Sequence, residues 1–399
     1  MAMVSALSGG GQPRPLHVLA LMDTTSVSGP LRQLVANLDD LGRDHAVSSH
    51  VVICTRFGSD ITAVKAFLAA HGISMTHVED RGRFDWSLLG TYRRILRTSG
   101  ADVVQTHGYK PNILAGLLRI GRCWSAPWIA FFHGRTSESR FVRVFDRAAI
   151  MIMHWADRIV VVSDRHRSYF RLWTSRVLHL PNAVLDSSGA STHAVPDAMA
   201  GHPVLFVGRL SPEKGVDVLL AALHHAAKDG TSISADIVGD GPLRKALESQ
   251  AESLGLRDLV TFHGHQSDVT AFYRRATVLC LPSRSEGMPN VVLEAIALGL
   301  PIVATPVGDV AKLVPSAIGR LVTPDDPVAL ACALTETLRE GPSPGYHQAR
   351  AMLLAEYSRT TRAENMRRAY DALTGRLLNG DSAKSSGPSG FTSSDPRPV

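Results

Sequence analysis

The sequence contains no hydrophobic run long enough to cross a membrane. A spanning helix needs about 18 or more consecutive apolar residues, and the longest candidate, Ala148–Trp155, is short and interrupted by His154. The first residues also lack the basic segment and apolar core of a secretory signal. We therefore expect a cytoplasmic protein.

Cysteines and metal-binding patterns are equally sparse. The four cysteines are scattered without metal-like pairing, at Cys54, Cys123, Cys280 and Cys332. Three of them lie in or beside apolar runs, which favours buried, reduced thiols over disulfides or a zinc site. No Asp-x-Asp element follows a predicted strand, and no His/Cys cluster occurs. We therefore expect no bound metal and no separate cofactor.

Length and charge give the first positive indications. A chain of 399 residues is too long for one ordinary core, so two domains are expected. Residues 1–200 carry 22 Lys and Arg against 15 Asp and Glu, a net charge of +7, whereas the remaining residues carry −1. This surplus suggests an anionic partner for the first half, although a solvated basic face is a simpler explanation.

Short apolar runs alternate with segments of helical periodicity through both halves. The predicted strands are Leu16–Met22, His50–Cys54, Ala101–Thr106, Trp128–Phe132, Arg158–Ser163, Pro203–Arg209, Ala235–Gly239, Val260–His263, Val278–Pro282 and Pro301–Pro306. This alternation predicts parallel sheets with helices on both faces. Ligands bind such sheets at the carboxyl ends of the strands, so the residues that follow each strand should carry the chemistry.

A polar segment of small residues separates the two halves. We predict an N-terminal α/β domain over residues 1–185, a linker over 186–202 and a C-terminal α/β domain over 203–345. A helical segment over 346–378 and a disordered tail over 379–399 complete the chain.

The loop Gly208–Gly215, GRLSPEKG, follows a predicted strand and opens a helix. Arg209 and Lys214 lie five residues apart on it and can converge on one anion, above helix amides with a favourable dipole. A pyrophosphate leaving group needs such support, because negative charge grows on it as its bond breaks. Ordinary surface charges are the alternative.

The segment Glu286–Glu294, EGMPNVVLE, carries two carboxylates. Pro289 suits the first turn of a helix, which places Glu286 in the preceding loop and Glu294 in the second turn. Helical side chains lean toward the N-terminus, so Glu294 can approach the pocket of Glu286. Free amides would face an anion between them, those of Met288, Asn290 and Val291. A helix cap and a solvated helix position are the alternative.

In their order along the chain, these motifs resemble glycosyltransferase family 4, which has the GT-B architecture of two facing Rossmann-like domains around a deep cleft. The similarity also includes IVGDGPLR (237–244), PSRSEGMPNVVLEAIALGLPIVAT (282–305), VVVSD (160–164) and LPNAV (180–184), and covers most of residues 16–375. It implies retaining, metal-independent transfer of a hexosyl or related group from a nucleotide diphosphate sugar. The acceptor would be a glycan, a lipid-linked molecule or another cell-envelope component.

The resemblance implies roles for single residues. Arg209 and Lys214 would hold the donor diphosphate. Glu286 would bind hydroxyls of the transferred sugar and Glu294 the nucleotide ribose, which agrees with what cations and carboxylates recognise. His133, after a predicted strand, matches a histidine near the acceptor. The final helical segment would cross back to the first domain.

Some positions depart from the family pattern. Gly29 permits close approach of the backbone to the phosphates, but Pro30 replaces the second glycine of the usual pair and removes an amide donor. Gly308 and Asp309 stand where the family usually has two glycines. His107 follows a strand as His133 does.

Other functions stay open. A GT-B phosphorylase or sugar-nucleotide epimerase would use a similar phosphate grip, and a non-catalytic protein could simply bind nucleotide sugars. We expect no nucleic-acid partner.

The basic first domain also suggests peripheral binding to the anionic inner face of the membrane. The sequence RFVRVFDR places apolar residues at helical spacing between arginines, an arrangement typical of an interfacial helix. The apolar residues are Phe141, Val144 and Phe145, and the arginines are Arg140, Arg143 and Arg147. Packing of this stripe on the domain's own sheet is the alternative.

Overall fold

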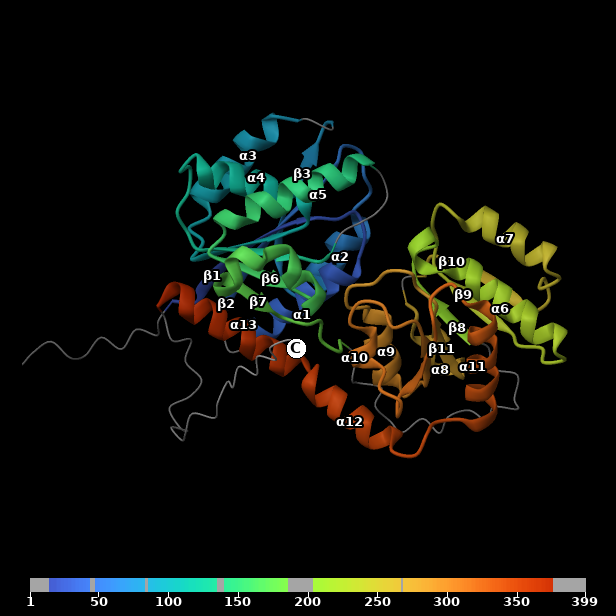
Figure 1. Ribbon diagram of the computed structural model, residues 1–399. Coiled ribbons are helices and arrows are strands. Elements are labelled where there is room, and N and C mark those ends of the chain that lie inside the picture. Colours follow the sequence, from blue (N-terminus) through green and yellow to red (C-terminus); the bar gives the residue numbers. More distant parts are fainter. Residues whose placement is uncertain are drawn as a thin grey trace, which may run out of the picture.

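The computed structural model describes residues 14–43, 47–82, 85–134, 140–185, 204–266 and 268–375, with the backbone alone for 140–143. They form two α/β lobes side by side (Figure 1). Each lobe has one parallel sheet. The predicted fold class is therefore confirmed. The expected linker at 186–202 and tail at 379–399 lie outside the described residues.

The N-terminal lobe holds a seven-stranded sheet of order β3-β2-β1-β4-β5-β6-β7. Its strands are β1 (Leu16–Asp23), β2 (Val47–Arg56), β3 (Ser74–Asp80), β4 (Val103–His107), β5 (Trp128–Phe132), β6 (Arg158–Val161) and β7 (Val177–His179). Its helices are α1 (Gly29–Gly42), α2 (Thr62–Ala70), α3 (Ser87–Thr98), α4 (Tyr109–Ile120), α5 (Arg140–Ile152) and the 3-10 segments η1 (Met153–Trp155) and η2 (Asp164–Arg176).

The C-terminal lobe holds a six-stranded sheet of order β10-β9-β8-β11-β12-β13. Its strands are β8 (Val204–Val207), β9 (Ala235–Val238), β10 (Val260–Gly264), β11 (Val278–Leu281), β12 (Ile302–Ala304) and β13 (Gly319–Leu321). Its helices are η3 (Pro212–Lys214), α6 (Val216–Lys228), α7 (Arg244–Ser253), α8 (Thr270–Arg275), α9 (Asn290–Leu298), α10 (Val310–Leu313) and α11 (Pro327–Glu340); α12 (Tyr346–Glu356) and α13 (Arg359–Thr374) follow.

The ten predicted strands are all present, with ends within three residues of those expected. Three strands were missed: β3, β7 and β13. Each lies at a sheet edge, and their residues are mostly half-buried or exposed. They therefore lack the continuous apolar run by which a strand buried on both faces is recognised.

The chain crosses between the lobes twice, at adjacent places. It leaves the N-terminal lobe through Leu180–Val184, and the amide of Val184 donates to the carbonyl of Tyr357 at 2.8 Å. Tyr357 lies between α12 and α13. Arg350 of α12 donates to the carbonyl of Ile296 in α9 at 2.7 Å. In Figure 1, α12 lies beneath the C-terminal lobe and α13 beneath the N-terminal lobe.

Helix α13 is part of the N-terminal core. Arg359 at its start pairs with Asp39 and Asp40 of α1, at 3.0 and 2.8 Å. Met366 and Tyr370 are fully buried in the apolar cluster that α1, α2 and one face of the sheet form. The last helix therefore closes the core of the lobe in which the chain begins.

We expect Met366→Ala to lower the free energy of unfolding of the N-terminal lobe by about 2–5 kcal/mol, because it leaves a cavity in a closed core. Met352→Ala is the matched control, since Met352 on α12 is 66% exposed and its loss should change stability by about 0.5 kcal/mol or less. Urea unfolding followed by tryptophan fluorescence measures both. Equal midpoints for the two variants would contradict the core role of α13.

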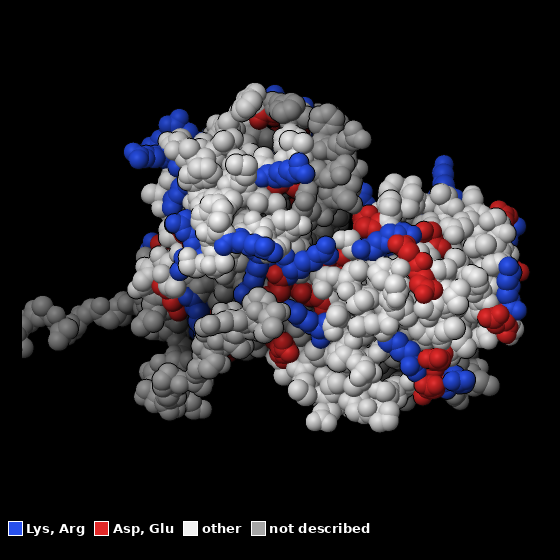
Figure 2. Space-filling model, in the orientation of Figure 1, with Lys and Arg blue, Asp and Glu red and all other residues white. Residues whose placement is uncertain are grey.

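A charged cluster also joins the lobes, and Figure 2 shows charges of both signs where they meet. The amide of Asp164, after β6, donates to Asp309 Oδ2 at 3.3 Å, and the Asp164 carboxylate pairs with Lys312 of α10. The amide of Asp309 donates to the carbonyl of Gly287 at 2.9 Å. Burial would raise the pKa of Asp164, but Lys312 and His179 outweigh it and lower that pKa. The position that departs from the family's glycine pair is thus an interdomain contact.

Asp309→Ala should loosen this contact by about 1 kcal/mol, since it removes a hydrogen-bond acceptor and one of the charges near Lys312. This corresponds to a roughly fivefold shift toward more open forms. Small-angle scattering should then give a larger radius of gyration than for wild type. Asp258→Ala, at an exposed position of the C-terminal lobe, should leave the radius unchanged. Equal radii of gyration for wild type and both variants would show that the Asp309 contact does not hold the lobes together.

Candidate functional site

Two loops at the carboxyl ends of β8 and β11 pack together in the C-terminal lobe. The amide of Arg284 donates to the carbonyl of Glu213 at 2.8 Å. Gly215 follows η3 with a φ of 66°, and a Cβ there would lie 2.0 Å from the carbonyl oxygen of Pro282. No other residue type fits this backbone and this approach. Gly215 therefore brings the predicted phosphate loop against the end of β11.

This packing joins two predicted site residues that lie 72 positions apart. Lys214 Nζ donates to Glu286 Oε1 at 2.7 Å, and Ser283 Oγ donates to the same oxygen at 2.7 Å. The side chain of Glu286 is 8% exposed and that of Lys214 is 22% exposed. A carboxylate so enclosed has lost most of its contact with water, and these two donors replace it. The site therefore presents a positive group for phosphate beside a negative group for hydroxyls.

Arg284, which the sequence did not single out, holds these loops in place. Its guanidinium binds both carboxylate oxygens of Asp217, at 2.9 and 2.6 Å, and Asp325 at 2.6 Å. It also donates to the carbonyl of Pro212 at 2.7 Å. The hydrogen bonds that Arg284 donates to Asp217, above all, raise the pKa of Arg284. The sequence offered one signal for this role: Arg284 lies in the PSRSEG motif, between the end of β11 and Glu286.

Helix α9 carries the second carboxylate. Pro289 is the N-cap residue and Asn290 the first helical residue, so the prediction that Pro289 lies in the first turn was wrong by one position: its ψ of 122° is extended. Tyr273 donates to Glu294 Oε2 at 2.8 Å and contacts the carbonyl of Val291 at 3.3 Å. Burial, first, and the nearby Glu294 raise the pKa of Tyr273 well above its ordinary value. Tyr273 therefore stays a donor that orients Glu294, a role the sequence did not indicate.

Residues of the N-terminal lobe reach the start of α9. A Cβ on Gly29, at the start of α1, would lie 2.3 Å from Asn290 Nδ2, so any larger residue would displace the Asn290 side chain. Gln33 Nε2 donates to Asn290 Oδ1 at 3.2 Å. Asn182 Nδ2 donates to the carbonyl of Met288 at 3.0 Å. The line where the two lobes meet, called the seam below, therefore brings together Gly29, Met288 and Asn290. Gln33 and Asn182 make the contacts across it, and the sequence did not indicate either residue.

Arg209 is placed differently. It follows β8 and is exposed, and its carbonyl accepts from the amide of Ser211 at 3.0 Å. The structure therefore brings together Lys214 with Glu286 and leaves the Arg209 side chain at the rim of the same loop.

His133 lies at the carboxyl end of β5, close to the other lobe. A Cβ on Gly287 would lie 3.7 Å from the carbonyl oxygen of His133. His133 Nε2 lies 3.1 Å from Nδ1 of His107, the last residue of β4. Burial, followed by the charges of Arg362 and His166, lowers the pKa of His133 to about 4. His133 is therefore a neutral imidazole beside the loop that carries Glu286.

Polar side chains from the ends of β1 and β3 and from the start of α4 form a further group, which the sequence did not indicate. Lys110 Nζ pairs with Asp80 Oδ2 at 2.5 Å, at the end of β3. Asp23 ends β1 beside them; burial raises its pKa, Lys110 opposes this shift and Asp80 adds to it. Asp23 is the last residue of a correctly predicted strand, so the rule that selects strand ends could have found it.

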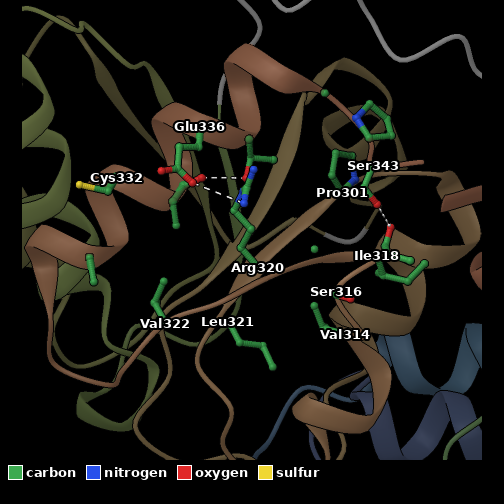
Figure 3. A pocket seen from close by; sticks show the side chains of 17 residues that line it. Pro301, Val314, Ser316, Ile318, Arg320, Leu321, Val322, Cys332, Glu336 and Ser343 are labelled. Carbon is green, nitrogen blue, oxygen red and sulfur yellow. Dashed lines mark hydrogen bonds and ion pairs between the residues drawn. The ribbon is translucent and has the colours of Figure 1, made fainter. Parts of the chain in front are cut away.

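A separate hollow of about 580 Å³ lies along the edge strand β13 and α11. Figure 3 shows Arg320 directed toward Glu336 across it, with Ser343 at the other end. None of the predicted site residues lines this hollow. Within the ranges that the structure describes, no three His, Cys, Asp or Glu residues are grouped as metal ligands would be. Metal independence stays a prediction.

Comparison with known proteins places the chain in a family. Residues 31–184 match the model of "Glycosyltransferase Family 4" and residues 201–340 that of "Glycosyl transferases group 1". A Campylobacter jejuni α-1,4-N-acetyl-D-galactosaminyltransferase that acts on an undecaprenol diphosphate-linked glycan is 32% identical over 253 residues, 62% of this chain and 68% of that protein. The α-D-kanosaminyltransferase of Streptomyces kanamyceticus is 28% identical over 61% of this chain and 69% of its own length. An uncharacterised Haemophilus influenzae glycosyltransferase is 32% identical, over 41% of its length.

Solved structures agree on the fold. The Anabaena protein Alr3699/HepE, in complex with UDP and glucose, superposes with a TM-score of 0.77 at 20% identity, over 90% of this chain and 100% of the other. Sucrose-phosphate synthase from Thermosynechococcus elongatus gives 0.70 at 22% identity, over 90% and 99%. The two family matches, the Campylobacter relative and the shared architecture lead to one conclusion: the chain belongs to glycosyltransferase family 4 and is a glycosyltransferase of GT-B fold.

Proposed function

We propose that this enzyme transfers a hexosyl or related group, with retention of anomeric configuration and without a metal ion, from a nucleotide diphosphate sugar to a glycan or lipid-linked acceptor of the cell envelope. The observation that carries the proposal is the contact between Lys214 and Glu286 at 2.7 Å. It places a cation suited to a phosphate next to a carboxylate suited to sugar hydroxyls, at the carboxyl edge where GT-B ligands bind.

The donor would lie between this pair and α9. Lys214 and Arg209 would stabilise charge on the departing diphosphate, and the N-terminal amides of α9 would add a favourable dipole. Glu286 would orient the transferred sugar, and Glu294, held by Tyr273 at 2.8 Å, would bind the ribose. Similarity to the Campylobacter transferase, whose name specifies a lipid-diphosphate-linked glycan, supports the class of acceptor.

The acceptor would enter from the N-terminal lobe. His133 faces the seam, and Asp23 with the Lys110–Asp80 pair lies at the same edge of the sheet. Carboxylates accept hydrogen bonds from neighbouring hydroxyls, so this edge suits a polyol. In a retaining reaction on one face of the sugar, the departing phosphate would accept the proton of the acceptor hydroxyl.

Replacing Lys214 or Arg209 with Ala should lower kcat about a hundredfold or more, by analogy with the loss of one preorganised oxyanion donor. Lys245→Ala, at an exposed position of α7, should keep wild-type turnover. The assay measures transfer and slow hydrolysis across a panel of nucleotide sugars, with and without excess EDTA, and NMR reads the anomeric configuration of the product.

Activity within twofold of wild type for both variants would exclude the diphosphate assignment. Loss of turnover in EDTA with recovery in Mg²⁺ or Mn²⁺ would exclude metal independence. An epimerised nucleotide sugar as product would identify a sugar-nucleotide epimerase instead. Binding of nucleotide sugars without turnover would identify a non-catalytic binding protein.

We also propose that the N-terminal lobe binds anionic membrane, through a surface that differs from the predicted stripe. Phe145 packs against Tyr109, with ring centroids 6.1 Å apart, and the side chains of Arg140, Phe141 and Arg143 lie outside the described residues. Val144, Arg147 and Met151 share one exposed side of α5. No helix in the ranges that the structure describes is long and apolar enough to span a bilayer.

Segment η2 extends this surface. His154, in η1 directly after α5, packs on Trp173 with ring centroids 3.4 Å apart. Arg176 donates to the His154 carbonyl at 3.3 Å. Beside them Leu172 is 83% exposed and Trp155 is 50% exposed. Arginines alternating with exposed apolar side chains are typical of an interfacial surface. Figure 2 shows Lys and Arg side chains across the front of this lobe.

Replacing Arg147, Arg171 and Arg176 together with Glu should weaken binding to phosphatidylglycerol vesicles by a hundredfold or more, since each basic residue contributes about 1 kcal/mol at an anionic surface. The control carries the same charge change on the other lobe, at Lys245, Arg257 and Arg339, which are exposed. Co-sedimentation measures both. Equal binding to phosphatidylcholine vesicles, or none to either, would exclude the surface as a membrane contact.

A further inference from the structure

A chain of four hydrogen-bonding side chains runs from the last helix to the seam. Gln105 Nε2, in β4, donates to the hydroxyl of Tyr370 in α13. Gln105 Oε1 lies 3.3 Å from His107 Nε2, and His107 Nδ1 lies 3.1 Å from His133 Nε2. Gln105 and Tyr370 are fully buried and His107 nearly so. Each link therefore has to match a donor with an acceptor, because water cannot replace either.

The two imidazoles are neutral at physiological pH. Burial, with the nearby His133 and Arg362, lowers the pKa of His107 well below its ordinary value. His133 is lowered to about 4 by burial, Arg362 and His166. The guanidinium of Arg362 is buried and donates to the carbonyl of Pro181, so its charge adds to the cost of a second cation nearby. A neutral imidazole carries one N–H and one lone pair.

The structure orients the Gln105 amide with its NH₂ group donating to Tyr370, and this orientation assigns every other proton in the chain. Its NH₂ group is directed to Tyr370, so its oxygen faces His107 and can only accept. His107 must carry its proton on Nε2, which leaves Nδ1 as an acceptor. His133 must therefore carry its proton on Nε2 to donate to His107. The lone pair of His133 is left on Nδ1.

We propose that Tyr370, Gln105 and His107 are positioning residues that fix the tautomer of His133, so that His133 Nδ1 accepts a hydrogen bond from a sugar hydroxyl at the seam. The role toward a sugar rests on the proposed function, whereas the tautomer does not. Tyr370 belongs to α13, the helix that returns from the C-terminal lobe. Docking of α13 on the N-terminal lobe therefore decides which ring nitrogen of His133 accepts a hydrogen bond.

The tautomer can be read without any substrate. In protein labelled with ¹⁵N-histidine, the resonances of His133 are those missing from His133→Asn. We expect a protonated Nε2 and a bare Nδ1 in wild type at pH 7. A bare Nε2, or a doubly protonated ring, would overturn the proposal whatever the enzyme's activity.

Tyr370→Phe keeps the ring but removes the acceptor for the Gln105 amide, so Gln105 can turn and both tautomers of His133 should become populated. Gln105→Met should have the same effect. Tyr346→Phe is the matched control, since Tyr346 is buried in the other lobe and its hydroxyl has no partner among the described residues. A purely structural role for Tyr370 would lower stability and leave the ¹⁵N pattern of His133 unchanged, which would overturn the relay.

Activity supplies the second measurement. We expect kcat/KM for transfer to fall about tenfold in Tyr370→Phe and Gln105→Met, as for one misdirected hydrogen bond. His133→Asn places an amide oxygen near the position of Nδ1 and should retain more activity than His133→Gln, which reaches toward Nε2. The reverse order would refute Nδ1 as the substrate contact. Absence of transfer in wild type would instead refute the proposed function and leave the NMR result standing.

Discussion

The double crossing of the chain between the sheets is the constraint on which the rest of the structure depends. Val184 leaves the N-terminal lobe hydrogen-bonded to Tyr357, which begins the return. A single crossing would leave the lobes joined by a flexible link, whereas two adjacent crossings restrict their relative orientation. Because α13 then completes the N-terminal core through Met366, the lobe that begins the chain is finished by its last helix. The carboxyl ends of both sheets are thereby held near one seam.

At that seam the two lobes contribute different chemistry. The C-terminal loops present a close cation and carboxylate, Lys214 and Glu286, held in place by Arg284 and its carboxylate partners. The N-terminal strand ends present neutral imidazoles and the Lys110–Asp80 pair. Phosphate recognition needs fixed positive charge, while a polyol needs fixed donors and acceptors. Under the proposed function, this division would keep the site for the charged donor apart from the site for the acceptor.

Asp309 and His133 show how contacts outside the candidate site reach its residues. Asp309 holds both the amide of Asp164 across the seam and, through its own amide, the carbonyl of Gly287 beside Glu286. His133 is joined to α13 through side chains alone. Asp309 therefore links the orientation of the two lobes to the loop that carries Glu286. The chain that reaches His133 depends instead on the docking of α13 on the N-terminal lobe.

The local sequence pattern was enough to predict the central strands and the two-lobe α/β class, because buried parallel strands are continuous apolar runs. It also predicted the loops that carry Arg209, Lys214, Glu286 and Glu294, because polar loops follow those strands at the ligand-binding edge. The edge strands β3, β7 and β13 carry no such run and were missed. The pairing of Lys214 with Glu286, 72 positions apart, was decided only by which strands adjoin. The link between Gln105 and Tyr370, 265 positions apart, depends on the return of the last helix to the first lobe. The periodicity of the sequence reports only residues that are close along the chain, so it predicts single helices and strands. Which side chains become partners depends on how those helices and strands pack, and the periodicity carries no information on that packing.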